Sequence, residues 1–217
     1  MDEHNNPSSS GNDQENSAPE NPGFSFWGEI KSIFKETLEF LLTLALAVGL
    51  VLFVRAYVIQ PFIISGDSMF PNFINNELIV VNELTYHFEQ PQRGDVIVFK
   101  YPLNTSEDFI KRVIGLPGET VSIKDGKVYI YNAAHPNGIA LNESQYLNAD
   151  VYTGHDMTMQ LGPNQYFVMG DNRPDSRDSR FGWNVPRSDI IGKVFVVVWP
   201  FNDAHAFQTP TYNISNH

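Results

Sequence analysis

Three segments of the chain hold side chains that could carry out chemistry together. The first is FIISGDSMFP at residues 62–71, in which apolar residues lead to Ser68. If this run is extended, Phe62, Ile64 and Ser68 share one face, and an apolar wall leads to a hydroxyl. A serine hydroxyl becomes a nucleophile only when a neighbouring base removes its proton. The segment therefore predicts a candidate nucleophile that needs a base.

That base could be a histidine or a lysine. A lysine amine acts as a base only if burial lowers its pKa from about 10.4 toward about 7–8. The second segment, FIKRVI at residues 109–114, places Lys111 and Arg112 among apolar residues on opposite faces of a strand. Alternation alone does not decide which of the two faces the apolar side. The histidines are in polar or turn-like contexts and are predicted to be surface residues: His4, His87, His135, His155, His205 and His217.

The third segment, MGDNRPDSRDSRFG at residues 169–182, is rich in turn-forming and charged residues. A solvated loop is the ordinary interpretation of such composition. Asp178 and Arg180 could pair to hold this loop, and a serine hydroxyl could accept a hydrogen bond from a lysine amine. These would be supporting roles around the first two segments.

The elements that must position these side chains are short strands. Runs of β-branched and aromatic residues, bounded by Gly, Pro, Asn or Asp, predict strands at residues 78–81, 96–99, 109–114, 121–123, 128–131, 166–169 and 193–199. Asp125-Gly126 lies between two of them and favours a tight two-residue hairpin. Leu116-Pro117-Gly118 is typical of a second turn. We expect a mainly β domain over residues 60–217.

The N-terminal part of the chain has a different character. Residues 1–23 are polar and acidic and are predicted to be a disordered tail. Residues 24–59 form an amphipathic segment followed by the uncharged run 40–54, which predicts one transmembrane helix that anchors the protein. A cleaved secretory signal would need a basic N-terminus and a small-residue cleavage site, so a retained anchor fits better. A buried core helix is the third alternative.

Composition excludes several classes of function. The chain has 25 acidic and 14 basic residues, a net charge of −11, so nucleic acid is not an expected partner. It has no cysteine, which excludes disulfides, thiol nucleophiles and thiolate metal sites. Three Asn-X-Ser/Thr triplets, at Asn104, Asn142 and Asn213, are taken as chance occurrences.

Four segments behind the predicted anchor resemble the signature boxes of the bacterial type I signal peptidase family. They are SGDSMFP at 65–71, RGDVIVF at 93–99, IKRVIGLPG at 110–118 and GDNRPDSRDSR at 170–180. The resemblance covers most of residues 55–201. The short stretch between Lys111 and Gly170 is similar to the compact, single-anchor members of the family.

The resemblance implies a role for each candidate residue. Ser68 is the nucleophile, Lys111 the general base and Ser176 the residue that orients the lysine, while Asp178 and Arg180 hold the site. The walls of the shallow pockets for small substrate residues are Phe62, Ile64, Met69 and Ile110. The family uses no metal and no cofactor. It also implies a signal-peptidase-like β domain outside the plasma membrane, with the N-terminus in the cytoplasm.

Three positions depart from the family's pattern. Asn72 and Phe73 stand where threonine and leucine are usual, which could alter the pocket beside the nucleophile. Gly66 stands where some members have a serine whose hydroxyl stabilises the oxyanion. The backbone N–H of Ser68 would then carry more of that stabilisation, and a compensating donor is expected.

The sequence thus predicts a membrane-bound serine endopeptidase that removes signal peptides from exported preproteins after a small residue. Its expected partners are preproteins and membrane lipid. Two other functions stay open: a Ser/Lys autoprotease of the SOS-repressor type, and a membrane-anchored β module without catalytic activity. The sequence does not reveal the oligomeric state.

Overall fold

The computed structural model describes residues 26–57, 59–212 and 214. The chain divides into two compact units, residues 1–48 and 49–217, and each is considered by itself. The acidic tail predicted for residues 1–23 lies outside the described residues.

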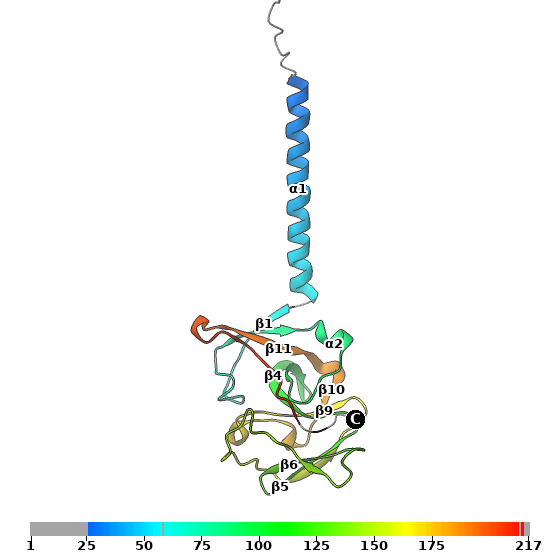
Figure 1. The fold of residues 1–217 in the computed structure, drawn as a ribbon, viewed down its shortest axis with the longest axis vertical. Helices are drawn as coiled ribbons and strands as arrows, with labels where there is room; N and C mark the ends of the chain where they lie inside the picture. Colours follow the sequence, from blue (N-terminus) through cyan, green and yellow to red (C-terminus); the bar gives the residue numbers. More distant parts are fainter. Residues whose placement is uncertain (1–25, 58, 213, 215–217) are drawn as a thin grey trace, which may run out of the picture. The chain divides into compact units, whose positions relative to one another are not determined.

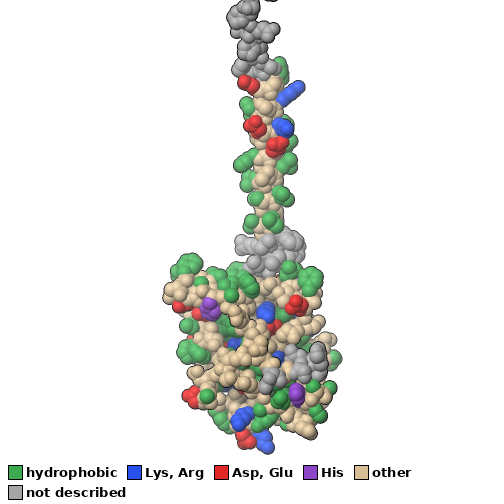
Figure 2. Space-filling view, viewed as in Figure 1, with side chains coloured by type: hydrophobic (Ala, Val, Ile, Leu, Met, Phe, Trp, Pro, Cys, Tyr) green, Lys and Arg blue, Asp and Glu red, His purple; other side chains and the backbone are tan. Residues whose placement is uncertain are grey.

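A single long helix, α1 (Phe26–Tyr57), covers both the predicted amphipathic segment and the predicted anchor. Its composition favours helix, because leucine is the most frequent residue of the uncharged run. Apolar side chains are exposed along its described part, including Trp27, Phe34 and Leu46 (Figure 2). Within the described residues, we find no helix that has both the length and the apolar character needed to cross a membrane.

The described residues form two sheets, and the larger one carries the candidate chemistry. Its strands lie in the order β1 (Ile59–Ile63), β2 (Leu78–Asn82), β11 (Ile190–Trp199), β3 (Val96–Tyr101), β4 (Asn104–Gly115), β9 (Gln165–Met169) and β10 (Val185–Pro186) (Figure 1). The short strand β12 (His205–Ala206) also pairs with β11. All pairs are antiparallel. The mainly β fold expected from the sequence is confirmed.

The smaller sheet has the order β7 (Ile139–Ala140), β6 (Lys127–Tyr131), β5 (Thr120–Lys124) and β8 (Met157–Gln160). Figure 1 shows β5 and β6 at the end of the β domain opposite to β1. Asp125 and Gly126 connect β5 to β6 with φ angles of 51° and 76°, as the hairpin prediction requires. In the second predicted turn, Glu119 N–H donates to Leu116 O at 3.1 Å.

Short helical turns complete the fold: α2 (Thr85–Phe88), η1 (Arg173–Asp175), η2 (Ser179–Phe181), η3 (Arg187–Asp189) and η4 (Phe201–Asp203). All seven predicted strands are present. The predicted strand ranges do not include β1, β7, β8, β10 and β12. The last four have only two to four residues, which is too short for an alternating pattern to be recognised.

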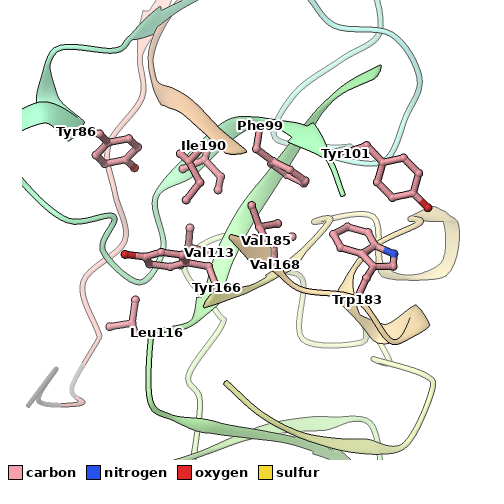
Figure 3. Close-up of a cluster of buried hydrophobic side chains, with 11 residues drawn as sticks. Tyr86, Phe99, Tyr101, Val113, Leu116, Tyr166, Val168, Trp183, Val185 and Ile190 are labelled. Atoms are coloured by element: carbon pink, nitrogen blue, oxygen red, sulfur yellow. The ribbon is translucent and has the colours of Figure 1, made fainter. Parts of the chain in front are cut away.

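In the part of the chain that the structure describes, buried side chains form three hydrophobic clusters. One cluster includes Phe99 and Tyr101 of β3, Val168 of β9, and Trp183 with Val185 near β10 (Figure 3). A second joins the smaller sheet to β9, and a third lies around β2, β3 and the segment after β1. Because β3 contributes to the first and third clusters, both faces of the larger sheet are buried there, and the strands that carry the candidate residues are held on two sides.

Candidate active site

A tight turn, and not a strand, places Ser68. The strand β1 ends at Ile63, and Gly66 has a φ of 93°, a left-handed conformation that glycine adopts without strain. The turn continues with a hydrogen bond from Phe70 N–H to Asp67 O at 3.0 Å. The expectation of one extended face from Phe62 to Ser68 is therefore wrong, because β1 ends at Ile63 and Ser68 lies in the turn that follows.

The structure brings Ser68 and Lys111 together. Lys111 lies on β4, and its Nζ donates to Ser68 Oγ at 2.7 Å and to Ile110 O at 2.8 Å. Its ammonium end also lies 5.2 Å from the centre of the Phe109 ring. Sequence alternation left open whether Lys111 or Arg112 meets the serine. In the structure it is Lys111, since Arg112 makes its contacts on the opposite side of β4.

The surroundings of Lys111 make its amine easier to deprotonate than that of an ordinary lysine. The side chain is 4% exposed, and this burial lowers the pKa of Lys111 from 10.5 to about 8. The negative charges of Asp178 and Asp171 act in the opposite direction, but loss of solvation is the larger effect. A lysine with this pKa is partly deprotonated near neutral pH, so it can accept a proton from the adjacent hydroxyl.

The charged loop after β9 is held by the pair predicted from the sequence. Arg180 Nε and Asp178 Oδ1 are 2.8 Å apart, and both side chains are buried. Asp178 Oδ2 also accepts the backbone N–H of Gly170 at 3.0 Å, and Arg180 Nη2 donates to Arg173 O at 2.8 Å. These bonds fix the start of the loop to its middle, so the loop is not the solvated segment that its composition suggests.

Ser176 lies in this loop, and its hydroxyl is buried without a hydrogen-bond partner in the described part of the chain. The predicted hydrogen bond from Lys111 to Ser176 is therefore not formed. A buried hydroxyl without a partner is costly and uncommon in native proteins.

A buried ion pair that the sequence analysis missed connects the base strand to the loop. Arg112 donates from Nε and Nη2 to the two carboxylate oxygens of Asp171 at 2.8 and 2.6 Å. Asn72 Nδ2, from the segment after the nucleophile, donates to Asp171 Oδ2 at 2.8 Å. Local sequence patterns carry no signal for this pair, because its members are 59 residues apart.

Asn172 extends this connection to the nucleophile itself. Its backbone N–H donates to Ser68 O at 3.0 Å, and its side-chain Nδ2 donates to Asp67 O at 3.0 Å. The loop after β9 therefore holds both peptide oxygens around Ser68. Asn172 is a further functional candidate that the sequence analysis did not single out.

A cavity of about 410 Å³ opens beside Ser68 and Lys111. Phe62, Ile64 and Ile110 line it, as predicted for pocket walls. Met69 is not among the lining residues, because its side chain is 1% exposed and packs in the third hydrophobic cluster. The lining residues that were not predicted are Ile63, Ser65, Ile79, Val98, Glu107, Asp108, Phe109 and Arg177.

One side of this cavity is the unpaired edge of a strand. The strand β4 pairs with β3 along most of its length, but its pairing with β9 begins only at Arg112. In the described chain, the stretch of β4 before Arg112 therefore has no strand on its second side. Such an edge can accept an extended peptide by main-chain hydrogen bonds.

Backbone donors near Ser68 differ in their availability. The Gly66 N–H donates to Asn75 Oδ1 at 2.9 Å, so it is occupied. The Ser68 N–H has no acceptor within the described residues. This N–H is thus available to an oxyanion, while no side-chain donor from residue 66 is possible.

Among the described residues, neither a metal-binding cluster nor a histidine lies at this cavity. The described residues contain no group of three or more histidine, aspartate or glutamate side chains that could hold a metal ion. The described histidines His87, His135, His155 and His205 do not line the cavity. The arrangement is instead that of a serine hydroxyl, an amine of lowered pKa and a peptide-sized cavity.

Comparison with known proteins gives a consistent result. Residues 37–199 match the family model for signal peptidase, peptidase S26. A protein named signal peptidase I from Leptolyngbya laminosa is 39% identical over 178 residues, which are 76% of this chain and 81% of that protein. A protein named signal peptidase I S from Bacillus subtilis is 37% identical over 78% of this chain and 92% of its own length.

Among solved structures, the crystal structure of a signal peptidase I from Enterococcus faecalis V583 has 34% sequence identity and a TM-score of 0.40. The match covers 48% of this chain and 97% of that chain.

Proposed function

Because the chain belongs to the signal peptidase family, peptidase S26, and so is a serine endopeptidase that removes signal peptides, we propose that Ser68 is its nucleophile and Lys111 its general base. The observation that carries the proposal is the 2.7 Å contact between Lys111 Nζ and Ser68 Oγ, made by a lysine whose pKa is lowered to about 8 by burial.

The proposed reaction is acyl transfer. Ser68 Oγ attacks the carbonyl carbon of the scissile peptide while Lys111 Nζ takes the hydroxyl proton. The peptide C–N bond then breaks, the ammonium of Lys111 gives the proton to the leaving amine, and an acyl-enzyme ester remains on Ser68. Water attacks the ester with Lys111 again as base, which releases the signal peptide and restores the serine.

The N–H of Ser68 supplies the proposed oxyanion donor. It is free in the described chain, and it belongs to the nucleophile residue itself, so it lies next to the carbon under attack. Gly66 offers no side-chain donor, so any second donor must come from another residue or from water. Loss of a single oxyanion donor commonly costs about 10²–10³ in rate.

The preprotein is proposed to bind as an extended strand beside the unpaired edge of β4. Phe62, Ile64 and Ile110 then form walls against the first and third side chains before the cut. Apolar walls around a shallow space of this kind favour small side chains, which fits cleavage after a small residue. Met69 contributes to this site only by supporting the turn from within the core.

A membrane anchor in residues 24–59 remains part of the proposal, together with a cytoplasmic N-terminus and an extracytoplasmic β domain. It rests on the uncharged run 40–54, with the amphipathic segment before it. Confining enzyme and membrane-inserted preprotein to one plane would raise their effective concentration. Retention of the full chain in the membrane pellet after alkaline carbonate extraction would support the anchor, and release into the supernatant would contradict it.

The other two functions lose their basis. The family match covers 163 of the 217 residues, which no autoprotease of the SOS-repressor type or non-catalytic module explains. Preproteins and membrane lipid are the proposed partners, and nucleic acid is not one.

The test is direct. The purified chain in detergent micelles is incubated with an exported preprotein and compared with Ser68→Ala. We expect the wild type to release the mature protein and the variant to leave the signal peptide attached. Ser144→Ala, which changes an exposed serine outside the cavity, serves as the matched control and should cleave normally. Cleavage by Ser68→Ala would contradict the assignment of the nucleophile.

The pH dependence follows from the pKa of Lys111. The amine must be neutral to act as base, so kcat/KM should be highest above a pH of about 8 and fall below it. Two pH units below this pKa only about 1% of the amine is neutral, so the rate should be about a hundredfold lower. The measurement is a pH profile of peptide cleavage. A profile that stays flat down to about pH 5 is incompatible with a neutral lysine base.

Gly170→Ala should disturb the nucleophile without touching a reacting group. A Cβ at this position would lie 2.3 Å from Ser68 O and 2.2 Å from Ser176 Oγ. The backbone at Ser68 must therefore shift, and a displacement of about 1 Å can cost about 10²-fold in rate. Steady-state kinetics would show the loss in kcat. The matched control is Gly154→Ala, since a Cβ there meets no atom within 4 Å and should leave kcat unchanged.

A further inference from the structure

A segment near the C-terminal end of the chain contacts residues that neighbour the proposed site. Residues 205–212, here called the C-terminal strap, follow η4 and begin with the short strand β12. This strap lies beyond residues 37–199, which are the part matched by the family model. Nothing in the family match therefore assigns it a role.

Several hydrogen bonds fasten the strap to the β domain. Phe207 N–H donates to Phe195 O at 2.9 Å, and Thr209 Oγ1 donates to Asp95 Oδ1 at 2.8 Å. Further along, the side chain of Gln145 makes two bonds with the backbone of Thr211, at 2.5 and 3.2 Å. The strap is thus attached at three separate points rather than resting on the surface.

One side chain of the strap touches both halves of the site. The ring of Phe207 lies 5.2 Å from the ring of Phe73, which is in the same turn as the nucleophile. The guanidinium of Arg112, the neighbour of the base Lys111, lies 5.3 Å from the centre of the Phe207 ring. The guanidinium of Arg112 also lies 4.1 Å from the centre of the Tyr146 ring. Two aromatic rings therefore cover this buried cation.

Arg112, the cation that Phe207 covers, belongs to the network that links the strand of the base to the turn of the nucleophile. Arg112 binds Asp171 through two hydrogen bonds, and the next residue, Asn172, holds the peptide oxygens of Ser68 and Asp67. A cavity of about 360 Å³ already lies beside Arg112, Tyr146 and Phe207. Removing the Phe207 ring would enlarge this cavity and admit water to the ion pair, which weakens it as the local dielectric rises.

We propose that the C-terminal strap positions the catalytic dyad, and that Phe207 is the positioning residue that keeps the Arg112–Asp171 pair dry and aligned. The inference rests on the proposed roles of Ser68 and Lys111. Phe207 touches no substrate and no reacting atom. It acts through Arg112 on the base strand and through Phe73 on the turn of the nucleophile.

The test compares Phe207→Ala and Phe207→Leu with the wild type in the full-length protein in detergent, using one preprotein-derived peptide. We expect kcat of Phe207→Ala to fall by about tenfold or more with little change in KM, because the dyad is misaligned while the peptide-binding cavity is intact. Phe207→Leu restores an apolar cover and should lie closer to the wild type. Phe201→Ala, which removes an exposed ring from the same region, is the matched control and should match the wild type.

Two further measurements separate positioning from a loss of folding. All kinetics are done well below the melting temperature of each variant, and the acid limb of the pH profile is recorded. Water near the dyad should move that limb upward, toward the ordinary lysine value, whereas a purely structural role would lower the melting temperature alone. If Phe207→Ala does not fold, Gln145→Ala releases the strap at Thr211 and should lower kcat in the same direction.

The outcomes are distinct. Wild-type kcat and an unmoved acid limb in Phe207→Ala, or in Gln145→Ala if that variant is used, would overturn the strap proposal while leaving the dyad in place. Failure of the wild type to cleave, or normal cleavage by Ser68→Ala, would overturn the proposed dyad itself.

Discussion

Lys111→Met should eliminate cleavage while leaving a folded protein. Methionine fills nearly the same apolar space next to Ser68 but has no group that accepts a proton. General base catalysis contributes about 10²–10⁴ in rate, so kcat/KM should fall by at least that factor. Single-turnover cleavage of a preprotein measures the loss. Lys111→Arg is the informative companion, because it retains a cation that is always protonated and should be equally inactive.

The substitution Lys111→Met should also make the protein more stable at neutral pH. The folded-state pKa of Lys111 is about 8, below the unfolded value of 10.5, so protonating this lysine opposes folding. The penalty is complete below a pH of about 8, shrinks as the pH rises from 8 to 10.5, and is absent above that range. A difference of this size corresponds to about 3 kcal/mol.

Urea unfolding at pH 7 and at pH 10.5 would measure this effect, with Lys111→Met more stable at the lower pH and similar to the wild type at the higher one. A gain in stability together with a loss of activity is the signature of a functional group kept in an unfavourable environment. Equal stability of the two proteins at both pH values would indicate that Lys111 is not desolvated.

Among the substitutions proposed here, Asp171→Ala should lower the free energy of unfolding the most. Asp171 is 2% exposed and accepts hydrogen bonds from Arg112 and Asn72, so its removal leaves a buried guanidinium without a counter-charge. Breaking one partner of a buried ion pair typically costs about 3–5 kcal/mol. The measurement is the free energy of unfolding in urea. The wild type and the variant are compared with the same m-value, which is the slope of that free energy against urea concentration.

Two controls make this prediction specific. Asp156→Ala removes an exposed carboxylate that makes no hydrogen bond or ion pair within the described residues, and it should change stability by less than about 0.5 kcal/mol. The double variant Arg112→Met/Asp171→Leu removes both charges and should recover much of the lost stability. A small effect of Asp171→Ala alone would show that water reaches Arg112 in the folded protein.

Much of the fold was predictable from local patterns. The strands around the site have enough β-branched and aromatic residues to be recognised, and the Asp125-Gly126 hairpin is specified by two residues that tolerate positive φ. The family was also recognisable, because its four boxes are each contiguous in sequence. Such features depend on residues that are close together in the sequence. They can therefore be predicted from the sequence alone.

The assembled site depended on contacts between distant residues. Ser68 and Lys111 are 43 residues apart, and Arg112 and Asp171 are 59 apart. The packing of strands and loops against one another decides that Lys111, and not Arg112, meets the serine. The same packing decides why Ser176 lacks a partner and where Met69 packs. Burial gives Lys111 its lowered pKa, and burial is a property of the packed domain, because no single segment removes enough water around an amine to make it a base.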